Sequence, residues 1–135
     1  MTRGEFSAAL EALARAWQAR DYERAASYFA EDVQYIDPLR YHHRSRSEVL
    51  RFYQDDQGHP QRTVWRTILF DEALQLGAAE YSYEGTYRYH GVALVEVRDG
   101  QITSWREYQH ISQLGWESLW TGAGIKPSPP TRGDG

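Results

Sequence analysis

Near the start of the chain an apolar residue recurs every three or four positions, at Phe6, Leu10, Leu13 and Trp17. This spacing is typical of the buried face of an amphipathic helix and predicts a helix over residues 5–19. Asp21 and Ser45 are each placed to cap a further helix, over 22–30 and 46–56, because their side chains can accept a hydrogen bond from a free backbone N–H.

From residue 62 onward the hydrophobic pattern changes from the helical period to a period of two. Alternating or β-branched segments predict a short strand among the helices and four later strands, over 33–37, 63–70, 74–89, 92–98 and 101–111. Asp99-Gly100 is a strong hairpin signal between the last two. Residues 39–44 are expected to form a loop, since Pro38 ends the short strand.

Helices first and antiparallel strands afterwards predict an α+β fold. One architecture that fits is a cone, in which three N-terminal helices close a strongly curved, mostly antiparallel sheet and leave a pocket. Residues 1–125 are expected to form a single domain. Residues 126–135 are rich in Pro, Gly and Ser and are predicted to be a disordered tail.

Composition and charge exclude several classes of function. The net charge is −4 with both signs interspersed, so the sequence indicates no nucleic-acid binding. Cysteine is absent, which excludes disulfides and thiol chemistry. No apolar run is long enough for a membrane span and no leader is visible, so a cytoplasmic protein is expected. No phosphate-binding glycine loop and no histidine pair at metal-ligand spacing is present, so we expect neither cofactor nor metal.

The candidate chemistry lies on two aromatic-rich strands. Asp37 ends the first and Glu107 lies on the last. Tyr35 shares a face with Asp37, and Trp105 shares one with Glu107, because side chains alternate along a strand. If the two carboxyl groups face each other across a poorly hydrated cavity, they cannot both ionise freely. One could then act as an acid and the other as a base, with Tyr35 orienting water or substrate.

A structural role for the same two carboxylates is also open. Asp37 could cap the turn that follows its strand, and Glu107 could form an ion pair with an arginine. The arginines considered are Arg62, Arg66 and Arg106.

Four residues are candidates for the substrate-binding wall. Trp105, Tyr83 and Trp17 would supply aromatic surface, and His90 a titratable ring. The face that His90 occupies depends on the hairpin. A two-residue turn puts it on the same face as Glu107, whereas a turn with a bulge shifts the register by one and turns it away.

Three segments together resemble a known family: residues 21–32, Asp37-Pro38, and residues 99–108, which read Asp-Gly-Gln-Ile-Thr-Ser-Trp-Arg-Glu-Tyr. They are similar to the nuclear transport factor 2-like superfamily, and most to its SnoaL-like branch, over residues 5–112. The resemblance implies a cone-shaped pocket, a homodimer formed through the outer face of the sheet, and the bulged register that turns His90 outward.

Two enzyme groups of that superfamily bear on the site. Ketosteroid isomerases carry an Asp-Pro with a general base where this chain has Asp37-Pro38, but their oxyanion donors fall near Leu13 and Ala93. In the likeness to limonene-epoxide hydrolases, Tyr35 matches a water-holding Tyr, Asp37 replaces an Asn and Glu107 replaces an Asp. The resemblance thus implies the water-holding half of such a site without its acid half.

The sequence therefore predicts a cofactor-independent enzyme, a hydrolase, isomerase, dehydratase or cyclase, acting on a small apolar substrate. Two alternatives stay open: a pocket that binds a small ligand without catalysis, and a dimerisation module with a filled pocket. An enzyme requires a cavity lined by the carboxyl groups, a binder has them turned away or ion-paired, and an interaction module has no cavity.

Overall fold

The computed structural model describes residues 1–122 of the 135-residue chain. Helices and short strands come first, then four long strands and a last short helix. In order they are α1 (Arg3–Gln18), α2 (Tyr22–Ala26), β1 (Phe29–Asp37), β2 (Tyr41–His43), α3 (Arg46–Gln54), β3 (Arg62–Asp71), β4 (Leu76–Glu84), β5 (Arg88–Arg98), β6 (Gln101–Ile111) and α4 (Trp116–Thr121). The predicted tail, 126–135, lies outside the described residues.

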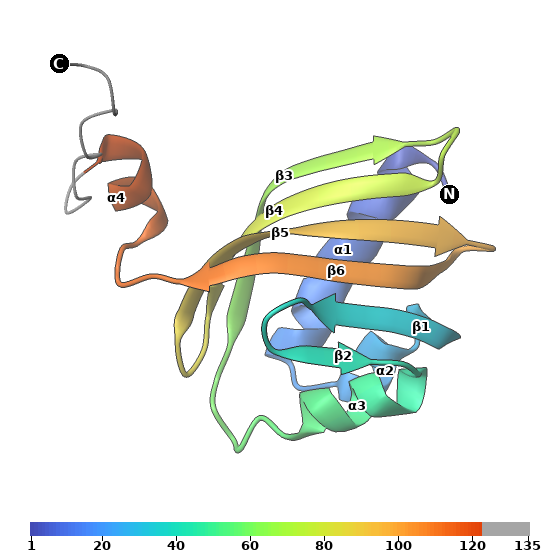
Figure 1. The fold of residues 1–135 in the computed structure, drawn as a ribbon, viewed down its shortest axis with the longest axis horizontal. Helices are drawn as coiled ribbons and strands as arrows, with labels where there is room; N and C mark the ends of the chain where they lie inside the picture. Colours follow the sequence, from blue (N-terminus) through green and yellow to red (C-terminus); the bar gives the residue numbers. More distant parts are fainter. Residues whose placement is uncertain (123–135) are drawn as a thin grey trace, which may run out of the picture.

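All six strands form one sheet in the order β2-β1-β6-β5-β4-β3. β1 runs parallel to β6, and every other neighbouring pair is antiparallel. Figure 1 shows α1 crossing one face of the sheet, with α2 and α3 beside β1 and β2. The α+β class with N-terminal helices and a mixed, mostly antiparallel sheet is confirmed, but the strong curvature expected of a cone is not.

The second and third helices begin where Asp21 and Ser45 predict, and α1 begins after Thr2, two residues before the predicted start at residue 5. The Thr2 hydroxyl accepts from the Glu5 backbone N–H, and the Glu5 carboxylate accepts from the Thr2 N–H. Asp21 accepts in the same way from the backbone N–H of Arg24, and Ser45 accepts from that of Glu48. Each side chain satisfies a backbone donor that the helix itself leaves free.

The second helix is shorter than the predicted 22–30. It ends at Ala26, because Phe29 is already paired with Ile102 at the start of β1. The Phe29 side chain is fully buried in the strand. A helix continued to residue 30 would also bury it, so the apolar spacing does not distinguish a helix from a strand at this position. Tertiary packing therefore decides against the last turn of the helix.

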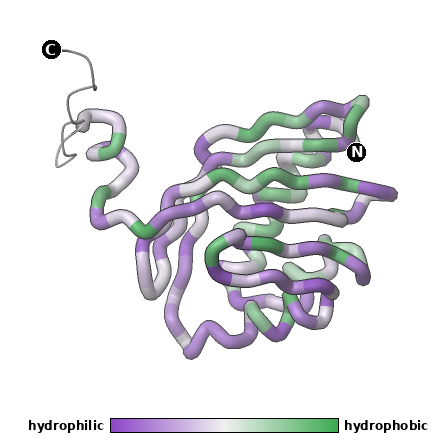
Figure 2. The backbone as a smooth tube through the Cα atoms, viewed as in Figure 1, coloured by the Kyte–Doolittle hydropathy of each residue, from purple (hydrophilic) through white to green (hydrophobic). Residues whose placement is uncertain are grey.

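The core lies between α1 and the inner face of the sheet. Phe6, Leu10 and Leu13 of α1 are each at most 1 % exposed, and the Phe6 ring stacks on Phe70 of β3 at 4.4 Å. Figure 2 shows hydrophobic and hydrophilic positions alternating along the strands, as a sheet with one covered face requires.

The predicted loop over 39–44 contains a strand. β2 pairs with the end of β1, with Asp37 opposite Tyr41 and Tyr35 opposite His43. A three-residue strand carries too little alternation to be found from its pattern. Its consequence for the site is direct, because it brings Tyr41 beside Asp37.

The β5–β6 hairpin has both a two-residue turn and a bulge, which the sequence offered as alternatives. Asp99 and Gly100 form a two-residue turn, both with positive φ (52° and 76°), as a type I′ turn requires. The register then shifts between Glu96 and Val97, which marks a bulge. Beyond it Glu107 lies opposite Ala93, so the register is the bulged one.

His90 is consequently on the outer face of the sheet, and its assignment to the substrate-binding wall is wrong. Its side chain is buried there, with Nε2 2.8 Å from the carbonyl oxygen of Leu114. Its ring lies beside those of His110 and Trp116. A one-residue slip in register moves every following side chain to the other face.

Candidate functional site

A cavity of about 500 Å³ lies on the inner face of the sheet. Aromatic side chains make up most of its wall, and four of the predicted site residues, Tyr35, Trp105, Tyr83 and Trp17, are among them. Glu107 also lines it, whereas Asp37 does not. This volume suits a small organic molecule.

Glu107 is held by donors on both of its oxygens. Oε1 accepts from the Tyr35 hydroxyl at 3.0 Å and from the Trp105 indole N–H at 2.9 Å. Oε2 accepts from the Tyr41 hydroxyl and, at 3.4 Å, from the Gln109 side-chain amide. Glu107 is only 8 % exposed and lines the cavity from β6.

The proposed ion pair between Glu107 and an arginine is not found in residues 1–122. Arg106 instead pairs with Glu96 at 3.0 Å, and Arg66 donates to Ser82. Glu107 is thus a buried acid stabilised by neutral donors rather than by a cation.

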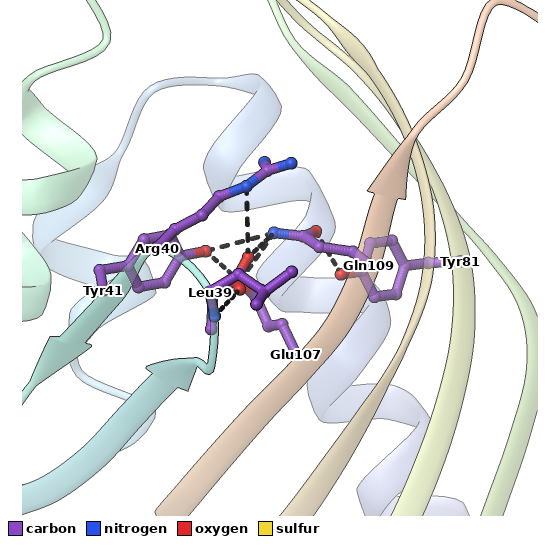
Figure 3. Close-up of polar contacts among 7 residues, drawn as sticks. Leu39, Arg40, Tyr41, Tyr81, Glu107 and Gln109 are labelled. Atoms are coloured by element: carbon purple, nitrogen blue, oxygen red, sulfur yellow. Dashed lines mark hydrogen bonds and ion pairs between the residues drawn. The ribbon is translucent and has the colours of Figure 1, made fainter.

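Asp37 is buried behind the cavity wall. Its Oδ1 accepts from the Leu39 backbone N–H at 3.0 Å, which caps the turn after β1. Its Oδ2 accepts from the Gln109 amide at 3.1 Å and lies 3.8 Å from Nε of Arg40. The amide nitrogen of Gln109 therefore bridges the carboxylates of Asp37 and Glu107; Figure 3 shows Gln109 pointing toward Glu107 and Tyr41. The expected direct opposition of the two acids across a cavity is replaced by a bridged arrangement.

The site makes protonation of Glu107 easier than in water. Burial raises the pKa of Glu107 above its ordinary value, and the negative charge of Asp37 raises it further. The hydrogen bonds from Tyr41, Trp105 and Tyr35 favour the anion and oppose this rise in pKa. The net effect is a carboxyl group whose proton is held to higher pH than that of an exposed glutamate.

The tyrosines of the wall keep their hydroxyl protons at neutral pH. Burial raises the pKa of Tyr83 to about 12 and also raises the pKa of Tyr35, Tyr41, Tyr53 and Tyr81. Each hydroxyl is therefore available as a hydrogen-bond donor, and Tyr35, Tyr41 and Tyr81 donate to other side chains of the site.

Another carboxylate on the wall, Asp56, has the opposite character. It accepts from the Tyr22 hydroxyl, from the Gly58 backbone N–H at 2.8 Å and from Arg20 at 3.0 Å. These contacts, with Tyr22 first, lower the pKa of Asp56 to about 2. A group ionised so firmly is a poor proton carrier near neutral pH, which leaves that role to Glu107.

The raised pKa of Glu107 predicts a pH dependence of stability. The folded protein binds this proton more tightly than the unfolded chain, so the stabilisation is complete below pH 4.5, the ordinary value. It is lost as the pH rises from there to the folded-state pKa, by up to about 1.4 kcal/mol per pH unit. Urea unfolding from pH 4 to 8 should show this slope in the wild type. The Glu107→Gln variant should lack this slope, so the difference in unfolding free energy between the two proteins should change with pH. Parallel curves for the two proteins would contradict the raised pKa.

Three residues of the site were not among the predicted ones: Tyr41, Gln109 and Arg40. Gln109 could have been found, because it lies two positions after Glu107 and so shares its face. Tyr41 and Arg40 lie in the segment interpreted as a loop. Arg40 places its guanidinium 4.7 Å above the centre of the Tyr89 ring and lines the cavity.

The position of Gln109 depends on a glycine opposite it. Gly91 of β5 pairs with Gln109, and a Cβ at Gly91 would lie 2.7 Å from the Cβ of Gln109 and 2.8 Å from the Tyr108 carbonyl oxygen. Gly91→Ala should therefore lower the free energy of unfolding by about 1–3 kcal/mol, the usual effect of overpacking. Urea unfolding measures the loss. Gly4→Ala is the control, since its Cβ would meet no atom closer than 4.0 Å, and equal stability of the two variants would refute the tight approach.

Residues 1–122 contain no group of three or more His, Cys, Asp or Glu side chains that could hold a metal ion. None of their helices is both long and apolar enough to cross a bilayer.

Comparisons with known proteins agree with this fold. The sequence model of the SnoaL-like domain matches residues 10–105. No curated protein matches the chain. An LEH-like epoxide hydrolase from M. tuberculosis is similar in structure, with a TM-score of 0.70 and 21% identity over 79% of this chain and 84% of the other.

Two other solved structures are similar to the same degree. The Δ5-3-ketosteroid isomerase from Mycobacterium sp. has a TM-score of 0.67 at 19% identity and covers 80% of this chain and 98% of its own. A computationally designed 17-OHP binder has a TM-score of 0.66 at 18% identity, with 78% and 95% covered. At such identities the likeness establishes the fold alone.

Proposed function

The chain belongs to the SnoaL-like domain family of the nuclear transport factor 2-like superfamily, and we propose that it is a cofactor-independent acid–base enzyme. Its substrate would be a small, mostly apolar molecule held in the aromatic cavity. The observation that carries the proposal is Glu107, a buried carboxyl group on the cavity wall with a raised pKa. Such groups cluster at sites of proton transfer.

Glu107 would carry the proton. Protonated, it can donate to an oxygen of the substrate, and ionised, it can take a proton from water or from carbon. Tyr35 would orient the carboxyl group through its 3.0 Å hydrogen bond. Asp37 would act through Gln109 as a positioning residue, because it does not line the cavity but contributes the charge that disfavours ionised Glu107. Glu107 alone would therefore transfer the proton, and Asp37 would only influence its ionisation and position.

The reaction class stays within those that need only proton transfer: hydrolysis, isomerisation, dehydration or cyclisation. Structural neighbours include an epoxide hydrolase and a ketosteroid isomerase, which supports the first two. The designed 17-OHP binder supports the use of this fold to hold a small molecule. A homodimer through the outer face of the sheet stays a prediction.

One observation favours a second function, ligand binding without catalysis. Both oxygens of Glu107 already accept hydrogen bonds from the protein, and Asp37 is within 3.8 Å of a cation. In a binder the same contacts would only make the cavity wall rigid. A dimerisation module with a filled pocket is disfavoured, because the pocket holds an empty volume of about 500 Å³.

An isotope-incorporation assay with a panel of compounds distinguishes an enzyme from a protein that only binds its ligand. The purified protein is incubated with a panel of cyclic ketones in D₂O and of epoxides in H₂¹⁸O, and mass spectrometry follows deuterium or ¹⁸O incorporation. An enzyme of the proposed kind accelerates incorporation into at least one compound over the buffer rate. A protein that protects ligands from exchange, or leaves every rate at the buffer value, is not this enzyme.

A further inference from the structure

Two hydrogen-bond donors on the cavity wall have no partner. The indole N–H of Trp17 and the hydroxyl of Tyr53 are buried, and neither has a partner at the distance and angle of a hydrogen bond within residues 1–122, although Tyr35 and Trp17 lie near enough to Tyr53 to lower its pKa slightly against the effect of burial. The side chains are 7 % and 9 % exposed. Buried polar groups in proteins are nearly always hydrogen-bonded, so a pair left unpaired in one place calls for an explanation.

Neighbouring donors on the same wall are satisfied. The indole of Trp65 donates to the Leu10 carbonyl at 2.8 Å, and that of Trp105 donates to Glu107. The Tyr35 hydroxyl also donates to Glu107. The unpaired groups are therefore not a general property of an aromatic wall, but a feature of two positions.

The two unpaired donors lie close to one another. Trp17 comes from α1 and Tyr53 from α3, and their rings meet edge to face with centres 5.8 Å apart. Both residues line the cavity. Two donor-bearing side chains from different helices thus meet in one region of the wall.

The chemistry of the pair restricts what it can bind. An indole N–H donates and cannot accept. The Tyr53 hydroxyl keeps its proton, because burial raises its pKa. A partner must therefore supply an acceptor oxygen, and a carbonyl oxygen with two lone pairs can accept from both donors at once.

The pair is also close to the acid. The Tyr53 ring lies 5.9 Å from that of Tyr35, and the Trp17 ring lies 6.0 Å from that of Trp105. Tyr35 and Trp105 are the residues that donate to Oε1 of Glu107. One small molecule can thus reach both the donor pair and Glu107 inside the same cavity.

We propose that Trp17 and Tyr53 form a subsite for a carbonyl oxygen, so that the ligand is a small, mostly apolar carbonyl compound such as a ketone, ester or lactone. This deepens the proposed function and rests on it for the catalytic use of the subsite. Where a reaction places negative charge on the carbonyl oxygen, the two donors would stabilise that charge. Sequence reasoning assigned Trp17 to the wall and did not assign Tyr53.

The test compares two probes of nearly equal shape. 2-Acetylnaphthalene carries a carbonyl group, and 2-ethylnaphthalene has a methylene in its place. Their affinities are measured by isothermal titration for the wild type, Tyr53→Phe, Trp17→Phe and the control Tyr108→Phe, whose hydroxyl belongs to the outer face. The wild type and the control should bind the ketone about tenfold more tightly than the hydrocarbon. Each donor variant should lose most of that preference and keep its affinity for the hydrocarbon.

A spectroscopic measurement distinguishes a lost hydrogen bond from a changed shape. With a ¹³C-labelled carbonyl, the bound ketone should absorb at lower infrared frequency in the wild type than in Tyr53→Phe or Trp17→Phe. A wild type that binds neither probe, or both equally, overturns the subsite, as does an unchanged preference and frequency in both donor variants.

Failure of the subsite and of the enzyme can be told apart. Glu107→Gln keeps both donors and should retain the ketone preference. An intact preference without isotope incorporation into any compound rejects the enzyme and leaves the subsite. Incorporation that depends on Glu107, without any ketone preference, rejects the subsite alone.

Discussion

Glu107→Gln should slow isotope incorporation into a responsive compound by about 10²–10⁴-fold, the usual contribution of a general acid or base. Glutamine keeps the size of the side chain and an acceptor oxygen for Tyr35 and Trp105, which donate to Oε1 in the wild type. It cannot take up or release a proton in the relevant pH range. The measurement is the initial rate of deuterium or ¹⁸O incorporation per mole of folded protein.

The matched control is Glu11→Gln. It makes the same chemical change on an exposed position of α1, so its rate should equal that of the wild type. If Glu107→Gln were as active as Glu11→Gln, Glu107 would not carry the proton and the acid–base assignment would be wrong.

Glu107→Ala should destabilise the fold by about 3 kcal/mol or more, since each buried donor left without a partner costs about 1–3 kcal/mol. The three donors concerned are Tyr35, Tyr41 and Trp105. The volume left by the lost side chain adds to the cost. Urea unfolding at pH 6 gives the difference from the wild type.

Glutamine at the same position separates the loss of hydrogen bonds from the loss of charge. It should lower the free energy of unfolding by much less than alanine, because its amide can still accept and donate. Glu11→Ala, on the surface, should stay within about 0.5 kcal/mol of the wild type. Equal stability of Glu107→Ala and Glu107→Gln would mean that the hydrogen bonds donated to Glu107 do not stabilise the site.

Much of the fold could be predicted because local and global signals agree. Asp21 and Ser45 cap the helices that they predict, and the apolar spacing along α1 indicates its buried face. The strand period placed Tyr35 and Trp105 on the inner face, where their rings now lie parallel, 5.9 Å apart. These inferences depend on residues within a few positions of each other, which pattern reasoning handles well.

The parts that failed depend on contacts between distant segments. The last turn of the second helix gives way to a pairing with residues more than 70 positions later. The face of His90 was decided by a bulge that the turn sequence does not reveal. The bridging role of Gln109 requires both Asp37 and Tyr81 beside it, from two other strands.

The donor pair could not be found from the sequence for a different reason. A tryptophan and a tyrosine on apolar helix faces are ordinary core residues. That Trp17 and Tyr53 lack partners is a property of everything packed around them, and it becomes visible only when all neighbouring hydrogen bonds are assigned.

The proposed function requires that Glu107 keep its proton to higher pH than a glutamate in water, inside a cavity that a ligand can enter. The most direct measurement is a pH titration of the ¹³C carboxyl resonances of glutamate-labelled protein, in which Glu107 is the resonance missing from Glu107→Gln. We expect a midpoint clearly above the ordinary value of 4.5, and a shift of that midpoint when 2-acetylnaphthalene binds. A midpoint at or below 4.5 would contradict it.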